Sequence, residues 1–157
     1  MSTYVAPEYW EDTLGDAYDE SGVGYPSLAR SFNRARYEAE LRGVDQALRA
    51  AGVTRPERVL DVGSGTGIWI DFWQRRGARE INGLDLTVTA VARLRGRFPG
   101  VAFAQEDIAE PVAALPAGMD AVSVMSVLTH VTDDARFVHV VRPGPSAKII
   151  VARRDAG

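Results

Sequence analysis

The sequence predicts an α/β fold in which helices cover both faces of a doubly wound, mainly parallel sheet. From about residue 55 onward, short apolar runs alternate with amphipathic stretches, which is the pattern of strands and helices in such a sheet. A glycine-rich turn at residues 63–67 links the first apolar run to the helix-like stretch after it. The chain has 157 residues, of which 46% are hydrophobic and 25% charged, so we expect one globular domain.

The first 52 residues are expected to form a helical segment that precedes the sheet domain of residues 53–157. Residues 1–26 are rich in aromatic and acidic side chains and hold no lysine or arginine. They fit either a solvated arm or a lid over the functional site. Residues 27–51 repeat apolar side chains at helical spacing. Ser27 is a plausible N-cap, Gly52 a plausible C-terminal stop, and Gly43 a point at which this helix divides in two.

The sheet domain is expected to alternate five strands with helices. Strands are expected near residues 58–60, 81–85, 101–104, 119–126 and 147–152, and helices over 66–76, 88–97 and 133–141. Thr87 and Thr132 are candidate N-caps of the last two helices. Trp69 and Trp73 share a face of the first helix and are expected in the core. Right-handed crossovers then bring the glycine turn, Asp85 and Asp107 to the same carboxyl edge of the sheet.

The glycine turn favours a nucleotide-like ligand, because glycines let the backbone come close and the next helix offers unpaired N–H groups. Its glycines stand at 63, 65 and 67, whereas a dinucleotide fingerprint needs its third glycine where Ile68 stands. Asp61, two residues before the turn, disfavours a pyrophosphate but suits a ligand with an amino group and a sulfonium. An NAD(P)-binding oxidoreductase is therefore the less favoured alternative.

Residues 61–67 resemble motif I of the class I S-adenosylmethionine-dependent methyltransferases, an acid followed by Gly-x-Gly-x-Gly. Asp85 follows Gly65 by 20 residues, the spacing at which a carboxylate reaches ribose hydroxyls. Further segments that match in order are the acid–apolar pair Asp107–Ile108, a motif IV-like strand at 119–126 and the turn Arg142-Pro143-Gly144. The resemblance covers roughly residues 55–152. It implies a Rossmann-like fold and S-adenosyl-L-methionine as the cofactor.

The resemblance also implies which residues contact the cofactor. Asp61 is expected to orient the methionine end, Asp85 to bind the ribose hydroxyls and Asp107 to accept from the adenine amino group. Leu86 and Ile108 would hold the adenine ring. Each has a plainer alternative as a turn, cap or core residue. The expected cofactor-binding residues are Asp61, Gly63, Ser64, Gly65, Gly67, Asp85, Leu86, Asp107, Ile108 and Ser126.

His130 is the expected catalytic base and a substrate-binding residue. It follows the fourth strand, and a pKa near neutrality suits removal of a proton from a hydroxyl or an amine. A packing histidine is the alternative. Tyr25, Asn33 and Arg36 are candidates for contact with the substrate or with a carboxylate of the cofactor, and surface or packing roles are their alternative.

Composition disfavours several other classes of protein. The chain has no cysteine and two histidines, so we expect neither disulfides nor a metal site. Its net charge of −3 argues against nucleic acid as a partner, and an Asn/Asp-Pro-Pro-aromatic motif of RNA methyltransferases is missing after the fourth strand. No apolar run approaches the ~20 residues of a membrane span, and the N-terminus does not resemble a signal peptide. We therefore expect a cytoplasmic protein that acts on a small molecule.

The sequence ends at Gly157, shortly after the fifth strand, and is expected to lack the last two strands of the family fold. Residues 148–151 would then form an apolar edge, covered by a second copy or another partner. Otherwise the chain is a fragment, or its catalysis is compromised. The expected function is O- or N-methylation of a small-molecule acceptor. The alternative is a truncated or catalytically impaired cofactor-binding protein or subunit.

Overall fold

The computed structural model describes residues 5–131, except 21, 26, 111 and 113–115, together with residues 148–152. These residues contain one five-stranded sheet in the order β3-β2-β1-β4-β5, and every pairing in it is parallel. This confirms the predicted parallel sheet. The strands are β1 Arg58–Val62, β2 Glu80–Asp85, β3 Ala102–Gln105, β4 Ala121–Met125 and β5 Lys148–Ala152.

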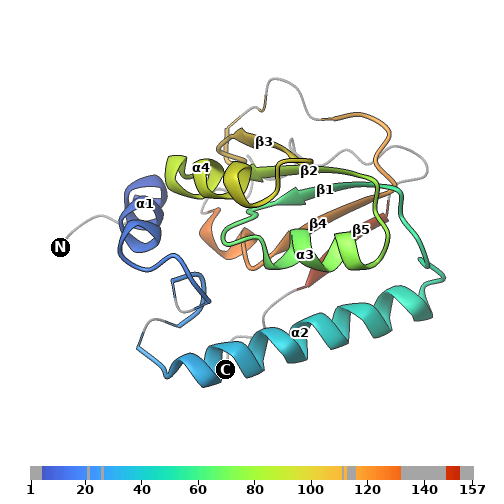
Figure 1. Cartoon of the computed structure of the whole chain (residues 1–157), viewed down its shortest axis with the longest axis horizontal. Coiled ribbons are helices and arrows are strands. Elements are labelled where there is room, and N and C mark those ends of the chain that lie inside the picture. Colours follow the sequence, from blue (N-terminus) through green and yellow to red (C-terminus); the bar gives the residue numbers. More distant parts are fainter. Residues whose placement is uncertain are drawn as a thin grey trace.

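The described helices are α1 Ala6–Asp16, α2 Arg30–Ala50, α3 Ile68–Arg75 and α4 Val88–Arg97, with a short 3-10 turn η1 at Leu128–His130. Figure 1 shows α2 along the bottom of the view, α3 between α2 and the strands, and α1 beside α4. The helix expected over residues 133–141 lies outside the described residues. None of the described helices has the length and apolar character needed to cross a membrane.

Alternate residues of the strands pack on the two faces of the sheet. On one face, Val59 of β1, Ile81 of β2 and Ala121 of β4 join a core with buried residues of all four α-helices, in which Trp73 is completely buried. On the other face, a second core forms around residues of β1, β2 and β4 together with Ile108 of the β3–β4 connection. In the described part of the chain, the four α-helices therefore contribute to the core on one face, and residues of the β3–β4 connection and of the segment after β4 cover the other.

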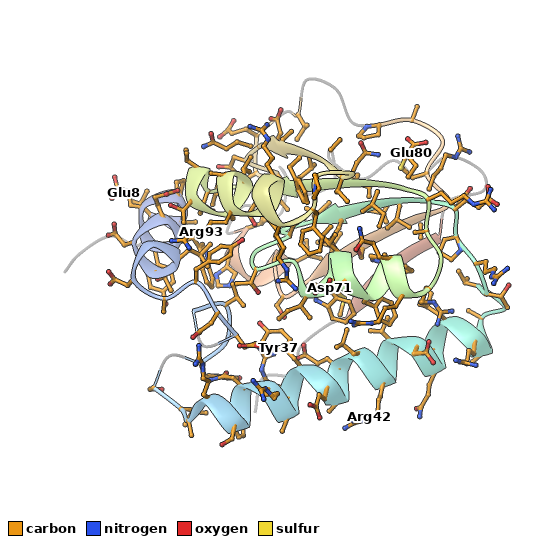
Figure 2. The ribbon with its side chains drawn as sticks, in the orientation of Figure 1. Glu8, Tyr37, Arg42, Asp71, Glu80 and Arg93 are labelled. Carbon is orange, nitrogen blue, oxygen red and sulfur yellow. The ribbon has the colours of Figure 1, made fainter. Side chains whose placement is uncertain are left out.

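The long helix α2 differs from its expected outline at two points. It runs unbroken through Gly43, which is exposed and meets no neighbour, because one glycine on a solvated face weakens a helix without ending it. Its N-cap is Ala29 rather than Ser27. Gly52 does end the helix, with φ +70°, as glycine commonly does. Figure 2 shows Tyr37 pointing from α2 toward the sheet domain and Arg42 pointing away from it.

Candidate functional site

A cavity of about 280 Å³ lies at the carboxyl edge of the sheet, where β1, β2 and β4 end. The parallel register puts Val62 of β1 beside Leu84 of β2 and Val124 of β4, so the loops after these strands meet there. The structure brings most of the expected site residues together in its lining. They are Gly63, Ser64, Gly65, Asp85, Leu86, Asp107, Ile108, Ser126 and His130.

The glycine turn is built from left-handed backbone and close approaches. Gly63, Gly65 and Gly67 have φ of +73°, +51° and +84°, which glycine adopts without strain. A Cβ on Gly63 would stand 2.1 Å from the side chain of Val127. Gly67 is not among the lining residues and instead forms the N-cap of α3. It faces Phe98, to which a Cβ would come within 2.5 Å.

Asp85 joins the end of β2 to the glycine turn. One of its carboxylate oxygens accepts from the backbone N–H of Gly65 at 2.7 Å. The other accepts from the backbone N–H of Thr87 at 2.9 Å and from its hydroxyl at 2.8 Å, and this hydroxyl accepts from Ala90 as the N-cap of α4. The acid and the turn therefore form one hydrogen-bonded unit at the cavity wall.

Asp61 lies beneath the turn rather than in the cavity lining. Its side chain is completely buried, and its Oδ1 accepts from the hydroxyl of Ser123 at 2.5 Å. That hydroxyl in turn accepts from the indole N–H of Trp73 at 2.9 Å. No described atom bonds Oδ2. Burial raises the pKa of Asp61 to about 7, although the hydrogen bond from Ser123 acts to lower it.

Asp107 and its neighbours form another part of the cavity lining. An Asp107 carboxylate oxygen accepts from the N–H of Ala109 at 2.8 Å, which holds the side chain in a local turn. Glu106, also in the lining, donates its backbone N–H to the carbonyl of Asp85 at 2.9 Å. The loops after β2 and β3 are thus tied together, with Leu86 and Ile108 as apolar lining residues.

The lining also contains aromatic side chains, around His130. His130 is half-buried in η1, and burial lowers its pKa from the ordinary value of 6.5. Its ring meets that of Trp10 edge to face, with centroids 4.9 Å apart. Ser126, at the end of β4, has φ +59°, a conformation that costs energy for a residue with a side chain and often occurs at functional sites.

Sequence reasoning missed the lining residues that α1 and the start of α2 contribute. The aromatic composition of residues 1–26 was their only signal, because it indicated a lid without identifying the residues involved. The cavity residues not expected from the sequence include Ala6, Trp10, Leu14, Val23, Tyr37, Glu106, Met125, Val127 and Val131.

Tyr25, Asn33 and Arg36 lie outside the cavity lining. The buried amide of Asn33 accepts from the backbone N–H of Tyr25 at 2.8 Å and donates to its carbonyl at 2.9 Å. The guanidinium of Arg36 lies over the ring of Tyr37, 4.1 Å from its centroid, and pairs with Glu40. The Asn33 bonds hold the start of α2 against the chain before it, whereas the Arg36 contacts with Tyr37 and Glu40 lie within α2.

The charge of the cavity is negative. Its lining includes the carboxylates of Asp85, Glu106 and Asp107, and none of the described lining residues is a lysine or an arginine. Within the described part of the chain, no three His, Cys, Asp or Glu side chains gather as metal ligands would. The cavity therefore suits a ligand with positive or neutral groups.

Comparison with known proteins shows which family the sequence matches. A family model described as a methyltransferase domain matches residues 59–144. A ubiquinone biosynthesis O-methyltransferase of Sodalis glossinidius is 38% identical over 135 residues, which are 81% of this chain and 53% of that protein. The Serratia proteamaculans protein of the same name is 39% identical over 105 residues, or 62% of this chain and 43% of that protein. The chain thus spans about half the length of the curated relatives it matches.

Solved structures show the same fold. The DhpI-SAM-HEP complex has a TM-score of 0.62 at 22% identity and covers 94% of this chain and 66% of its own. Magnesium protoporphyrin IX methyltransferase from Synechocystis PCC 6803, with bound SAM, has a TM-score of 0.57 at 19% identity and covers 83% of this chain and 66% of its own.

Proposed function

The chain belongs to the class I S-adenosylmethionine-dependent methyltransferase family, and from this premise we propose that it binds S-adenosylmethionine and methylates a small-molecule acceptor. One observation carries the proposal. The glycine turn, Asp85 and the Asp107–Ile108 pair, which follow three different strands, line a single cavity. A strand-ending acid beside a glycine turn is the arrangement that binds a ribose next to a closely approached backbone.

The residues present fit the parts of this cofactor. Asp85 is proposed for the ribose hydroxyls, Asp107 for the adenine amino group, and Leu86 and Ile108 for the adenine ring. Asp61 lies outside the cavity lining, so its proposed role in orienting the methionine end of the cofactor would act through the glycine turn that follows it. The negative lining favours a cationic molecule over a pyrophosphate.

His130 is proposed as the base that accepts the proton of the acceptor. S-adenosylmethionine supplies a methyl group on a sulfonium, which departs as a thioether. Because burial lowers the pKa of His130, its imidazole is neutral and able to accept a proton near pH 7. We propose a hydroxyl as the acceptor group because the curated relatives are O-methyltransferases, with an amine as the alternative.

Three further predictions from the sequence belong to this proposal. Residues 1–52 would act as a lid segment over the sheet domain of residues 53–157. β5 is an outer strand of the described sheet, and a second copy or another partner would cover it. The protein would work in the cytoplasm, without a nucleic-acid partner.

Calorimetry with S-adenosylhomocysteine and with NAD⁺ tests the cofactor. We expect the first to bind and the second not to bind. Asp85→Ala should weaken binding at least about tenfold, because a charged hydrogen-bonding group contributes about 1.5–3 kcal/mol. Glu80→Ala is the matched control, since Glu80 is exposed at the opposite end of the same strand (Figure 2). Binding of NAD⁺ alone, or full affinity in a folded Asp85→Ala protein, contradicts the assignment.

Transfer of a labelled methyl group to a panel of phenols and amines tests turnover. Product formation supports an enzyme. Binding of S-adenosylhomocysteine without any transfer would instead favour the alternative of a cofactor-binding protein or subunit that does not turn over.

A further inference from the structure

Helix α1 is fastened to α4 by the carboxylate of Glu11. Its Oε2 accepts from the backbone N–H of Val88 at 2.8 Å, and its Oε1 accepts from the N–H of Thr89 at 3.1 Å. The hydroxyl of Thr89 also donates to this carboxylate. These N–H groups are the first of α4, which have no partner inside their own helix and favour negative charge. A residue far away in the sequence therefore completes the helix that begins just after Asp85.

Trp10, the residue before Glu11, lines the cavity. Its indole stands edge to face against the imidazole of His130, with the ring planes at 85°. The ring of Tyr9 meets it on another side, with centroids 5.2 Å apart and planes again at 85°. The indole is thus held between two rings while it lines the cavity.

Two more contacts fix the position of the chain around α1. Leu14 is buried in the core, with only 2% of its surface exposed. The hydroxyl of Tyr18 donates to the carbonyl of Gly65, in the glycine turn, at 2.8 Å. The segment from Trp10 to Tyr18 consequently touches the glycine turn, α4 and η1 together.

We propose that Glu11 and Trp10 are positioning residues of the acceptor half of this site. Glu11 seats α1 on α4, and the seated Trp10 forms with His130 a wall against which an aromatic acceptor packs. This inference rests on the proposed function and adds the class of acceptor to it.

The chemistry of the wall selects the acceptor. Aromatic rings prefer offset or edge-to-face contacts with other rings, and Trp10 and His130 offer such contacts at the acceptor end.

Tryptophan fluorescence of the ligand-free protein tests the seating. A protonated imidazole quenches a neighbouring indole, so the signal of Trp10 should fall as the pH drops through a pKa of His130 below 6.5. Subtracting the signal of Trp10→Phe removes the contribution of Trp69 and Trp73. Glu11→Ala should loosen the α1–α4 contact about five- to thirtyfold, as the loss of a helix cap does. The quench should then weaken, and its midpoint should move toward 6.5.

The matched control is Glu8→Ala. Glu8 lies on the same helix, is exposed and points away from the sheet domain in Figure 2. The Glu8→Ala protein should show the same pH-dependent quench of Trp10 fluorescence as the unaltered protein. Glu11→Gln keeps one acceptor oxygen, without the charge and without the second oxygen, and should fall between the two. A quench that Glu11→Ala and Glu11→Gln leave unchanged overturns the proposed seating.

A probe acceptor tests the wall. Labelled-methyl assays with 4-methylcatechol compare the unaltered protein with Trp10→Ala. Trp10→Ala should raise the KM for 4-methylcatechol roughly two- to tenfold, the share expected of one aromatic contact, and leave S-adenosylhomocysteine binding within about threefold. An unchanged KM in a folded Trp10→Ala protein overturns the assignment of the wall. Failure of the unaltered protein to bind S-adenosylhomocysteine would instead refute the proposed function, while the fluorescence test would still report the seating.

Discussion

At the scale of single residues, Asp61 makes the stability of the folded protein depend on pH. Its carboxyl is 1% exposed, and burial raises its pKa to about 7. The unfolded chain holds an aspartate near its ordinary pKa of about 3.9. The folded state therefore binds this proton more tightly. The stability that the protonated group contributes is complete below about pH 4 and is lost as the pH rises to about 7.

Asp61→Asn should remove this dependence. The variant keeps the polar shape without the charge, so at pH 8 it should unfold at a higher temperature than the unaltered protein. The gain is at most about 4 kcal/mol, since one pKa unit corresponds to about 1.36 kcal/mol. Thermal denaturation of both proteins at about pH 5 and pH 8 measures the difference. Parallel pH profiles for the two proteins would show that Asp61 does not titrate in this range.

The surroundings of Asp61 show how far residue roles follow from sequence. The acid and its glycine turn form a local motif, which spacing alone reveals. Its partners Ser123 and Trp73 come from β4 and α3, and they meet Asp61 because the register pairs it with Ser123. Register and helix docking are tertiary properties, so no spacing predicts this network. For the same reason, Trp10 was not recognised as a neighbour of His130.

At the scale of elements, strands and helices with strong periodicity were predictable and α1 was not. The two helices of the sheet domain that the structure describes lie within the expected spans, and Thr87 caps α4 as expected. Residues 6–16 carry few apolar side chains, and their helix is anchored through Glu11 and Leu14 to distant parts of the chain. Tertiary packing rather than intrinsic propensity stabilises such a short helix, so its own sequence signals it weakly.

Gly67 is an element-scale test, because it starts α3 and also packs on α4. Gly67→Ala combines a left-handed φ of +84° with a clash, since the new Cβ would stand 2.5 Å from Phe98 and 2.9 Å from Leu94. Gly77 has nearly the same φ, +88°, and nothing within 4 Å. Gly77→Ala should therefore cost about 1–2 kcal/mol from the backbone alone. Gly67→Ala should cost about 1–3 kcal/mol more, as overpacking does. Urea denaturation measures the free energy of unfolding of both variants. Equal losses of stability would mean that the packing of α3 on α4 adjusts to the added methyl group without a loss of free energy.

At the scale of the whole molecule, Arg76 helps to join α2 to the sheet domain. Arg76, just after α3, donates to the carbonyls of Val53 and Thr54 at 3.0 and 3.3 Å and pairs with Asp45 of α2. Its side chain is only 10% exposed. It thus links α3, α2 and the connection to β1 on the side of α3 remote from the glycine turn.

Arg76→Ala should therefore loosen the attachment of α2 to the sheet domain. The charge-assisted hydrogen bond to the Val53 carbonyl alone is worth about 1.5–3 kcal/mol, and the free energy of unfolding should fall by at least that range. Arg49→Ala is the matched control, because Arg49 pairs with the same Asp45 but is 73% exposed, and exposed pairs contribute little. Urea denaturation followed by circular dichroism distinguishes the two variants.

If the α2 attachment is the weaker part of the molecule, Arg76→Ala should also lose two-state behaviour and show a first transition at low urea. Equal, single transitions in both variants would mean that the apolar face of α2, rather than Arg76, holds the N-terminal helices in place.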